Sequence, residues 1–158
     1  MISIAFLGCS SDSNDTPTPV PVAKTKVSIT RIDITQIPTN NSNGFAWDTA
    51  SAPDVYIKLY DETNILGYTS NYVTNAVPSI SNPLSVSFTN LTSTNLITGQ
   101  LKVQVWDDDL HDFPSSQDQK IGEVPFYLND YTIGSNKYPA FAVKNVNGTI
   151  ITIYMTWE

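Results

Sequence analysis

Acidic side chains gather in one stretch of the sequence, residues 107–120. Five of the 15 Asp and Glu residues of the chain lie there, and the only Lys or Arg is Lys120; the acids are Asp107, Asp108, Asp109, Asp112 and Asp118. Carboxylate oxygens are ligands that Ca²⁺ prefers, at about 2.3–2.6 Å. The first and third side chains of Asp107-x-Asp109 can point the same way and face one ion. The stretch therefore indicates a divalent-cation site, with a solvated acidic turn as the alternative.

A second pair of acids, Asp48 and Asp54, lies six residues apart in an earlier loop region. If this loop and the 107–120 stretch converge, several carboxylates come together. Two carboxylates about 5 Å apart repel each other by about 3 kcal/mol at an effective dielectric constant of 20. A bound cation removes this repulsion, so we expect Ca²⁺ to order the loops and to stabilise the fold.

Most of the chain alternates between apolar and polar residues, which is typical of half-buried β-strands. The alternation is clear at 27–34, 55–60, 84–88, 101–105 and 151–157, and it is weaker at 65–73, 121–128 and 141–143. A phase slip at Thr30-Arg31 predicts a β-bulge, and Asn-Gly pairs at 43–44 and 147–148 predict turns. The pattern predicts an all-β fold, an antiparallel β-sandwich over residues 24–158. The candidate acids fall at the ends of its strands.

Two of these regions resemble the calcium loops of C2 domains, the calcium- and phospholipid-binding β-sandwiches. Val105-Trp-Asp-Asp-Asp109, followed by Ile121-Gly-Glu123, resembles the third calcium loop of that family. Asp48 and the segment Asp54-Val-Tyr-Ile-Lys-Leu59 resemble the first loop, with the usual six-residue step between the acids. Here Pro53 precedes Asp54, an inverted order. The resemblance covers about residues 24–157 and implies an eight-stranded sandwich of type II-like topology, closed by the strand after Asn147-Gly148.

The resemblance also implies the site and its cofactor, Ca²⁺. The matching positions are Asp48, Asp54, Asp107, Asp109 and Asp118. Asp118 departs from the pattern, because it lies four residues before Gly122 where the family has three, and the loop is about four residues longer than usual. Asp108 and Asp112 are the alternative ligands. Three aromatic residues in the same loops, Phe45, Trp47 and Phe113, are candidates for membrane contact, with capping of the open end of the core as the alternative reading for Phe45 and Trp47.

The N-terminus resembles a bacterial lipoprotein signal, in which an apolar run ends in a small residue and a cysteine to be acylated. Here the run ends in Leu7-Gly8-Cys9 and is followed by a Ser-, Asp- and Pro-rich stretch. The resemblance implies a signal peptide over 1–8, lipidation at Cys9 and a disordered tether over 9–23. No Lys or Arg precedes Ile2, which is consistent with a truncated signal. We expect the protein to be lipid-anchored at the bacterial outer membrane or cell surface, outside the cytoplasm.

Composition excludes several classes of function. The net charge of −7 disfavours nucleic-acid binding, and a single Cys and a single His exclude a disulfide framework and His-rich metal centres. No hydrolase or phosphate-binding motif occurs, so we expect a monomeric binding module and no enzyme. Its expected partners are calcium with anionic phospholipid head groups or glycans. The alternative is a carbohydrate-binding β-sandwich with a structural calcium, using an aromatic face of Tyr56, Tyr60, Tyr68, Tyr72 and Tyr154.

Overall fold

The computed structural model describes residues 23–48, 51–61, 64–68, 72–88, 91–93, 98–109 and 117–158. The proposed signal peptide, Cys9, the tether up to residue 22, Asp112 and Phe113 lie outside these residues. The strands are β1 (Val27–Gln36), β2 (Val55–Asp61), β3 (Asn64–Tyr68), β4 (Leu84–Ser87), β5 (Thr92–Ser93), β6 (Gln100–Asp107), β7 (Gln119–Tyr127), β8 (Phe141–Val146) and β9 (Thr149–Trp157), and a 3₁₀ helix, η2, spans Leu128–Tyr131.

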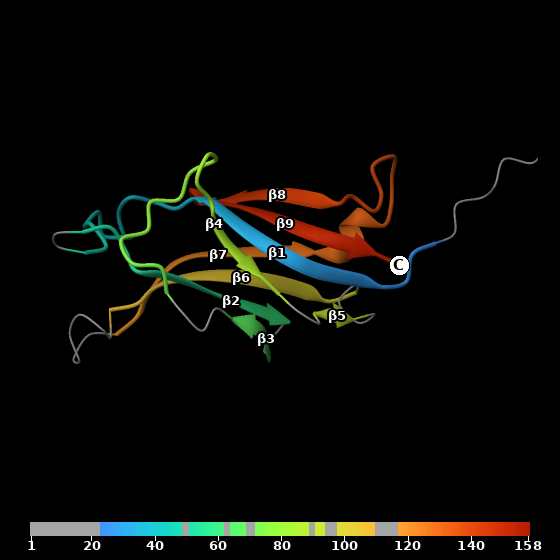
Figure 1. The fold of residues 1–158 in the computed structure, drawn as a ribbon, viewed down its shortest axis with the longest axis horizontal. Helices are drawn as coiled ribbons and strands as arrows, with labels where there is room; N and C mark the ends of the chain where they lie inside the picture. The colour runs from blue at the N-terminus through green and yellow to red at the C-terminus, as the bar shows by residue number, and fades with distance from the viewer. Residues whose placement is uncertain are drawn as a thin grey trace, which may run out of the picture.

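The strands form two packed antiparallel sheets, which confirms the predicted β-sandwich (Figure 1). One sheet has the order β4-β1-β9-β8, with the two-residue β5 also paired to β1. The other has the order β3-β2-β6-β7. Neither β5 nor its pairing could be predicted, because two residues are too short for an alternation pattern. Within the described residues, we find no helix with the length and apolar character that a membrane crossing requires.

The core lies between the sheets and follows the predicted alternation. Along β2, β6 and β9 every second side chain is buried. Ile57, Leu59, Val103, Val105 and Ile153 are fully buried, and each such side chain contributes about 1.5–3 kcal/mol relative to an exposed one. Because side chains alternate along a strand, this burial fixes the register and therefore the place of each strand end.

Two local features of the backbone agree with the sequence signals. The pairing of β1 with β9 shifts register between Ile29 and Arg31, so the predicted bulge is confirmed. Asn147 and Gly148 have φ values of 50° and 83° and join β8 to β9. Both residues are therefore left-handed, as a two-residue hairpin turn requires, and Asn-Gly is the pair that adopts this conformation most readily. The last strand then lies between β1 and β8.

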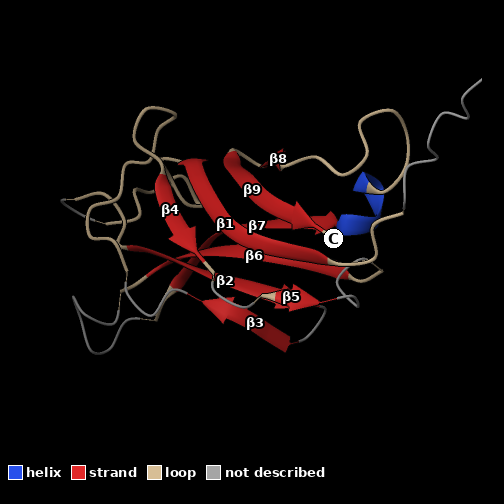
Figure 2. Ribbon diagram, turned by 45° about the vertical axis from the view of Figure 1, so that its right-hand side comes forward, coloured by secondary structure: helices blue, strands red, loops and turns tan. Residues whose placement is uncertain are grey.

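Different chain segments lie at the two ends of the sandwich. The start of β1 lies beside the end of β9, where Thr25 and Lys26 donate backbone hydrogen bonds to the Glu158 carbonyl at 2.8 and 3.0 Å. The 3₁₀ helix lies at this end too (Figure 2). The loop after β1, the segment before β4 and the end of β6 lie at the other end (Figures 1 and 2). Hence the described N-terminus and the candidate acidic loops lie at opposite ends.

Candidate metal centre

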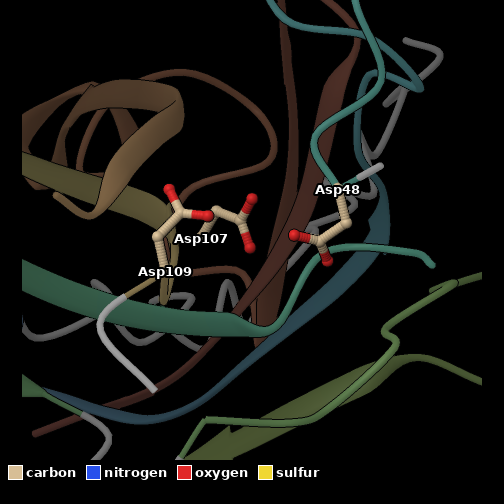
Figure 3. A group of neighbouring side chains, drawn as sticks. All are labelled: Asp48, Asp107 and Asp109. Atoms are coloured by element: carbon tan, nitrogen blue, oxygen red, sulfur yellow. The ribbon is translucent and has the colours of Figure 1, made fainter. Parts of the chain in front are cut away.

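Three aspartates from two separate loops meet at one end of the sandwich. Asp48, Asp107 and Asp109 each offer a carboxylate oxygen, and these three oxygens lie within 4.8 Å of one another. Figure 3 shows the carboxylates facing each other, Asp107 and Asp109 from the end of β6 and Asp48 from the loop after β1. Asp107 and Asp109 are buried, and Asp48 is half-buried. The fold therefore brings together the two regions that the sequence analysis singled out.

Asp107 occupies the centre of the group. It is the last residue of β6, its side chain is fully buried, and its Oδ1 accepts a hydrogen bond from the backbone N–H of Asp54 at 2.8 Å. Its other oxygen, Oδ2, is buried and has no hydrogen-bond partner among the described residues. A buried carboxylate oxygen without a partner is costly. A cation at this position would supply the missing partner.

The surroundings of Asp107 favour its protonated form. Burial, together with the negative charges of Asp48, Asp109 and Asp54, raises the pKa of Asp107 to about 7, against the lowering effect of the Asp54 N–H. The physical cause is that a charged carboxylate is poorly solvated here and is repelled by its neighbours. The same features attract a divalent cation, since the cation solvates the charge and cancels the repulsion. A proton and a cation therefore compete for Asp107.

Neighbouring side chains orient the other two carboxylates. Gln119 Nε2 donates to Asp109 Oδ2 at 3.0 Å, and Ser51 Oγ donates to Asp48 Oδ2 at 3.0 Å. Such contacts from outside the ligand set hold ligating oxygens in place. Gln119 and Ser51 were not predicted, because a neutral polar residue among other polar residues carries no distinguishing signal.

Asp54 lies beside the three-carboxylate group and is not one of its members. Its side chain is buried, and its Oδ1 accepts the backbone N–H of Asn75 at 2.7 Å. Its backbone also connects the loops, because its carbonyl accepts the N–H of Asp108 at 2.8 Å. Asp54 therefore joins the loop after β1 to the end of β6 and to the segment 72–83. Asn75 was not predicted from the sequence; it lies in a turn, where it adopts a positive φ of 51°.

Asp118 points to a tyrosine. Its Oδ2 accepts a hydrogen bond from Tyr56 Oη at 2.6 Å, and its Oδ1 is buried without a hydrogen-bond partner among the described residues. Burial and this hydrogen bond raise the pKa of Tyr56 above its ordinary value. Asp118 is not one of the three residues whose ligating oxygens lie within 4.8 Å of one another. Its role as a ligand stays a prediction, as do those of Asp54, Asp108 and Asp112.

Of the two described aromatic residues proposed for membrane contact, Trp47 is buried and Phe45 is exposed. Trp47 is 9% exposed, belongs to the core, and donates from Nε1 to the Pro38 carbonyl at 2.8 Å. The capping interpretation therefore fits Trp47. Phe45 is 69% exposed. Two apolar residues that the sequence analysis did not single out, Val77 and Ile80, are 74% and 89% exposed in the segment before β4.

The five tyrosines do not form one aromatic face. Tyr56 and Tyr60 lie on β2, and Tyr154 lies on β9 in the other sheet. Tyr56 stacks instead on Trp106, with ring centroids 6.4 Å apart and planes at 14°. Trp106 is half-buried on the outer face of β6. A single face of all five tyrosines, as in the alternative interpretation, is therefore not formed, because Tyr154 lies in the other sheet.

The residues present fit a hard divalent cation. Three carboxylates converge, one of them with a buried oxygen that lacks a partner. All potential ligands are oxygens, as Ca²⁺ prefers. The described neighbours Ser51 and Gln119 hold two of these carboxylates, those of Asp48 and Asp109, by hydrogen bonds.

The comparison with solved structures shows the fold. A structure described as that of a C2 domain superposes with a TM-score of 0.52 at 14% identity, over 84% of this chain and 97% of that one. Human GIVD cytosolic phospholipase A2, in complex with methyl gamma-linolenyl fluorophosphonate inhibitor and terbium chloride, superposes with a TM-score of 0.50 at 11% identity, over 84% of this chain and 17% of the phospholipase.

The chain therefore has the C2 fold, as the resemblance implied. No protein-family model matches the sequence, and no curated protein matches it. At this level of identity the similarity concerns the fold alone. The case for a function rests on the residues of the site.

Proposed function

We propose that this chain is a calcium-binding module with a binding role. The observation that supports it best is the group of Asp48, Asp107 and Asp109, whose ligating oxygens lie within 4.8 Å of one another. The Oδ2 of Asp107 is in addition buried without a hydrogen-bond partner among the described residues. Calcium takes six to eight oxygens, so three carboxylates leave positions for backbone carbonyls, water and an external ligand. An external oxygen ligand at such a position gives the module a means of binding a partner.

Calorimetric titration with CaCl₂ tests this proposal. We expect saturable binding at pH 8 that weakens as the pH falls below about 7, by up to about tenfold per pH unit, because the proton on Asp107 must leave. Binding should release protons, so the measured heat should depend on the ionisation enthalpy of the buffer. Asp109→Asn should weaken binding strongly, whereas Asp130→Asn, the same charge change in η2, should not. No heat of binding in millimolar calcium would contradict the proposal.

We also propose that the module is attached to a membrane outside the cytoplasm through Cys9. The support is the lipoprotein-like Leu7-Gly8-Cys9 sequence. The described N-terminus lies at the end of the sandwich opposite to the metal centre (Figure 1). An anchored chain would therefore enter the domain far from the loops and leave them free for a partner.

Replacing the cysteine tests the anchor. We expect Cys9→Ala in the full-length precursor to move the protein from the membrane pellet to the soluble fraction, because stable anchoring needs the acyl chains. Ser10→Ala should leave the protein in the pellet. Unchanged fractionation of Cys9→Ala would argue against lipidation.

For the partner, an anionic lipid surface fits the exposed apolar side chains near the metal centre. Phe45 and Ile80 are 69% and 89% exposed at the end where the acidic loops lie. Calcium would bridge the aspartates to lipid phosphates, while these side chains enter the interface. In vesicle sedimentation, we expect calcium-dependent binding to phosphatidylserine-containing vesicles that Ile80→Ser weakens several-fold, with Ile133→Ser, an exposed residue beyond η2, as control. Equal sedimentation in calcium and in EDTA would oppose this part of the proposal.

A further inference from the structure

A cavity of about 510 Å³ lies beside the metal centre. It is formed by the loop after β1, the start of β7 and the turn between β8 and β9. Its volume falls within the range of about 300–1,000 Å³ typical of small-molecule sites. Six of its described lining residues carry neutral amide or hydroxyl side chains: Asn40, Asn41, Ser42, Asn43, Gln119 and Asn147.

The cavity has little net charge. Lys120 is the one charged residue among the described residues that line it. Its Nζ is 3.2 Å from Glu123 Oε2, so the ammonium already has a carboxylate partner. No described carboxylate lines the cavity, although the chain as a whole carries a net charge of −7. This lining gives no electrostatic preference for a charged ligand and provides many groups that both donate and accept hydrogen bonds.

Backbone and side-chain hydrogen bonds hold one wall of the cavity in place. Asn41 Oδ1 accepts the N–H groups of Asn43 at 3.0 Å and Phe45 at 3.1 Å, and the Asn41 N–H donates to the Phe45 carbonyl at 2.8 Å. The Asn41 NH₂ group is thereby left as the donor available to a ligand. At the other wall, Gln36 Nε2 donates to the Gly148 carbonyl at 3.3 Å, next to Asn147. A preformed loop lowers the entropic cost of binding.

Apolar surface closes another side of the cavity. Trp47 and Pro38 both line it, and the indole Nε1 of Trp47 donates to the Pro38 carbonyl at 2.8 Å. This bond satisfies the only polar atom of the indole, so the lining part of Trp47 presents carbon atoms. Ile121 adds an aliphatic contact. The cavity thus combines amides and hydroxyls with an aromatic and aliphatic wall.

We propose that this cavity binds a neutral, polyhydroxylated ligand, of the size of a sugar unit. Such a ligand presents hydroxyls, which both donate and accept, to the amides of Asn41, Asn43 and Gln119, and it presents C–H groups to Trp47. Burying these hydroxyls is acceptable only where partners are available, and the lining supplies them. None of the five tyrosines of the alternative interpretation is among the described residues that line this cavity.

The cavity is connected to the metal centre and does not require it. Gln119 lines the cavity and donates from Nε2 to Asp109 Oδ2 at 3.0 Å. A bound cation would hold Asp109 and thereby Gln119, so calcium should strengthen sugar binding by a small factor. The other lining amides do not depend on the cation. The proposal can therefore be tested separately from calcium binding.

Saturation-transfer NMR with the full domain tests the proposal. The probes are glucose, galactose, mannose and N-acetylglucosamine, with glucuronate as a charged comparator, each in calcium and in EDTA. We expect saturation transfer to at least one neutral sugar in both conditions, and more than to glucuronate. The double variant Ser42→Ala/Asn43→Ala should reduce the transfer at least fivefold, because it removes two polar side chains from the lining. The control Ser85→Ala/Ser87→Ala changes two exposed serines of β4 and should leave the transfer unchanged.

Three outcomes would overturn the proposal. These are no transfer to any neutral sugar, equal transfer to Ser42→Ala/Asn43→Ala and the wild type, or stronger transfer to glucuronate than to every neutral sugar. Because the EDTA arm needs no cation, sugar binding that persists without any calorimetric calcium signal would overturn the calcium proposal alone. Calcium binding without sugar binding would overturn the sugar-binding proposal and leave the calcium proposal intact. A cooperative thermal melt of the double variant in EDTA is the check that it is folded.

Discussion

Calcium is expected to raise the melting temperature of this protein by about 10 °C at a hundredfold excess over its dissociation constant. Binding to the native state alone contributes about 2.7 kcal/mol under these conditions, and each kcal/mol shifts the transition of a domain of this size by a few degrees. The gain arises because the cation partners the buried Oδ2 of Asp107 and cancels the repulsion among Asp48, Asp107 and Asp109. Thermal denaturation in CaCl₂ and in EDTA measures it.

Asp107→Asn should be more stable than the wild type in EDTA and less stable than the wild type in calcium. The asparagine keeps an oxygen to accept the Asp54 N–H, now found at 2.8 Å, and removes the buried charge. In EDTA at pH 8 the variant should therefore melt above the wild type. In calcium it should melt below the wild type, since one ligand is neutral. Asp130→Asn is the matched control and should show the wild-type response. Identical wild-type melts in calcium and EDTA would contradict the metal centre.

The EDTA melts should also depend on pH in a defined direction. The pKa of Asp107 is raised to about 7 in the folded protein, above its ordinary value near 3.8. The folded state therefore binds the proton more tightly than the unfolded state, and this contribution to stability is complete only below the ordinary pKa. It is lost as the pH rises towards and through 7. In Asp107→Asn that part of the pH dependence should disappear.

Gly122→Ala is expected to destabilise the fold by about 3 kcal/mol, a fall of about 10 °C in melting temperature. Gly122 lies on β7 and faces Thr149 of β9, in the opposite sheet. An added methyl group would overlap the Thr149 hydroxyl oxygen and would lie 3.1 Å from Thr149 Cβ. Thr149 is fully buried and cannot move into solvent. The glycine of Ile121-Gly122-Glu123 is therefore required because the two sheets approach each other closely at this point.

The partner residue provides the control for Gly122→Ala. The Thr149 hydroxyl is buried without a hydrogen-bond partner among the described residues, so Thr149→Ala alone should cost little. The double variant Gly122→Ala/Thr149→Ala should recover at least half of the lost stability, a coupling that a double-mutant cycle in urea measures. Additive effects would show that the contact is not the cause.

Much of the fold was predictable because it depends on local patterns. The alternation fixed which faces of β2, β6 and β9 are buried, the phase slip at Thr30-Arg31 marked the bulge, and Asn147-Gly148 marked the hairpin turn. These signals are readable because side-chain direction has period two and because few residues tolerate a positive φ. The convergence of Asp48 with Asp107 and Asp109 follows once the strand ends are known.

The remainder depends on contacts between segments far apart in sequence. Asp118 hydrogen-bonds to Tyr56, 62 residues away, and Asp54 accepts from Asn75, 21 residues away. Nothing in the local sequence at Asp118 specifies whether its carboxylate accepts a hydrogen bond from a hydroxyl group or binds a cation. The same limit applies to the cavity beside the metal centre, whose lining comes from three separate parts of the chain. Such sites require the tertiary structure.

The most direct test of the metal centre is a crystal structure grown or soaked in CaCl₂, with terbium as an anomalously scattering substitute. We predict one ion bound by carboxylate oxygens of Asp48, Asp107 and Asp109 at about 2.3–2.6 Å, in contact with the Oδ2 of Asp107. Crystals that contain calcium in the solvent, with no density between these three side chains or with the ion bound elsewhere, would contradict the account.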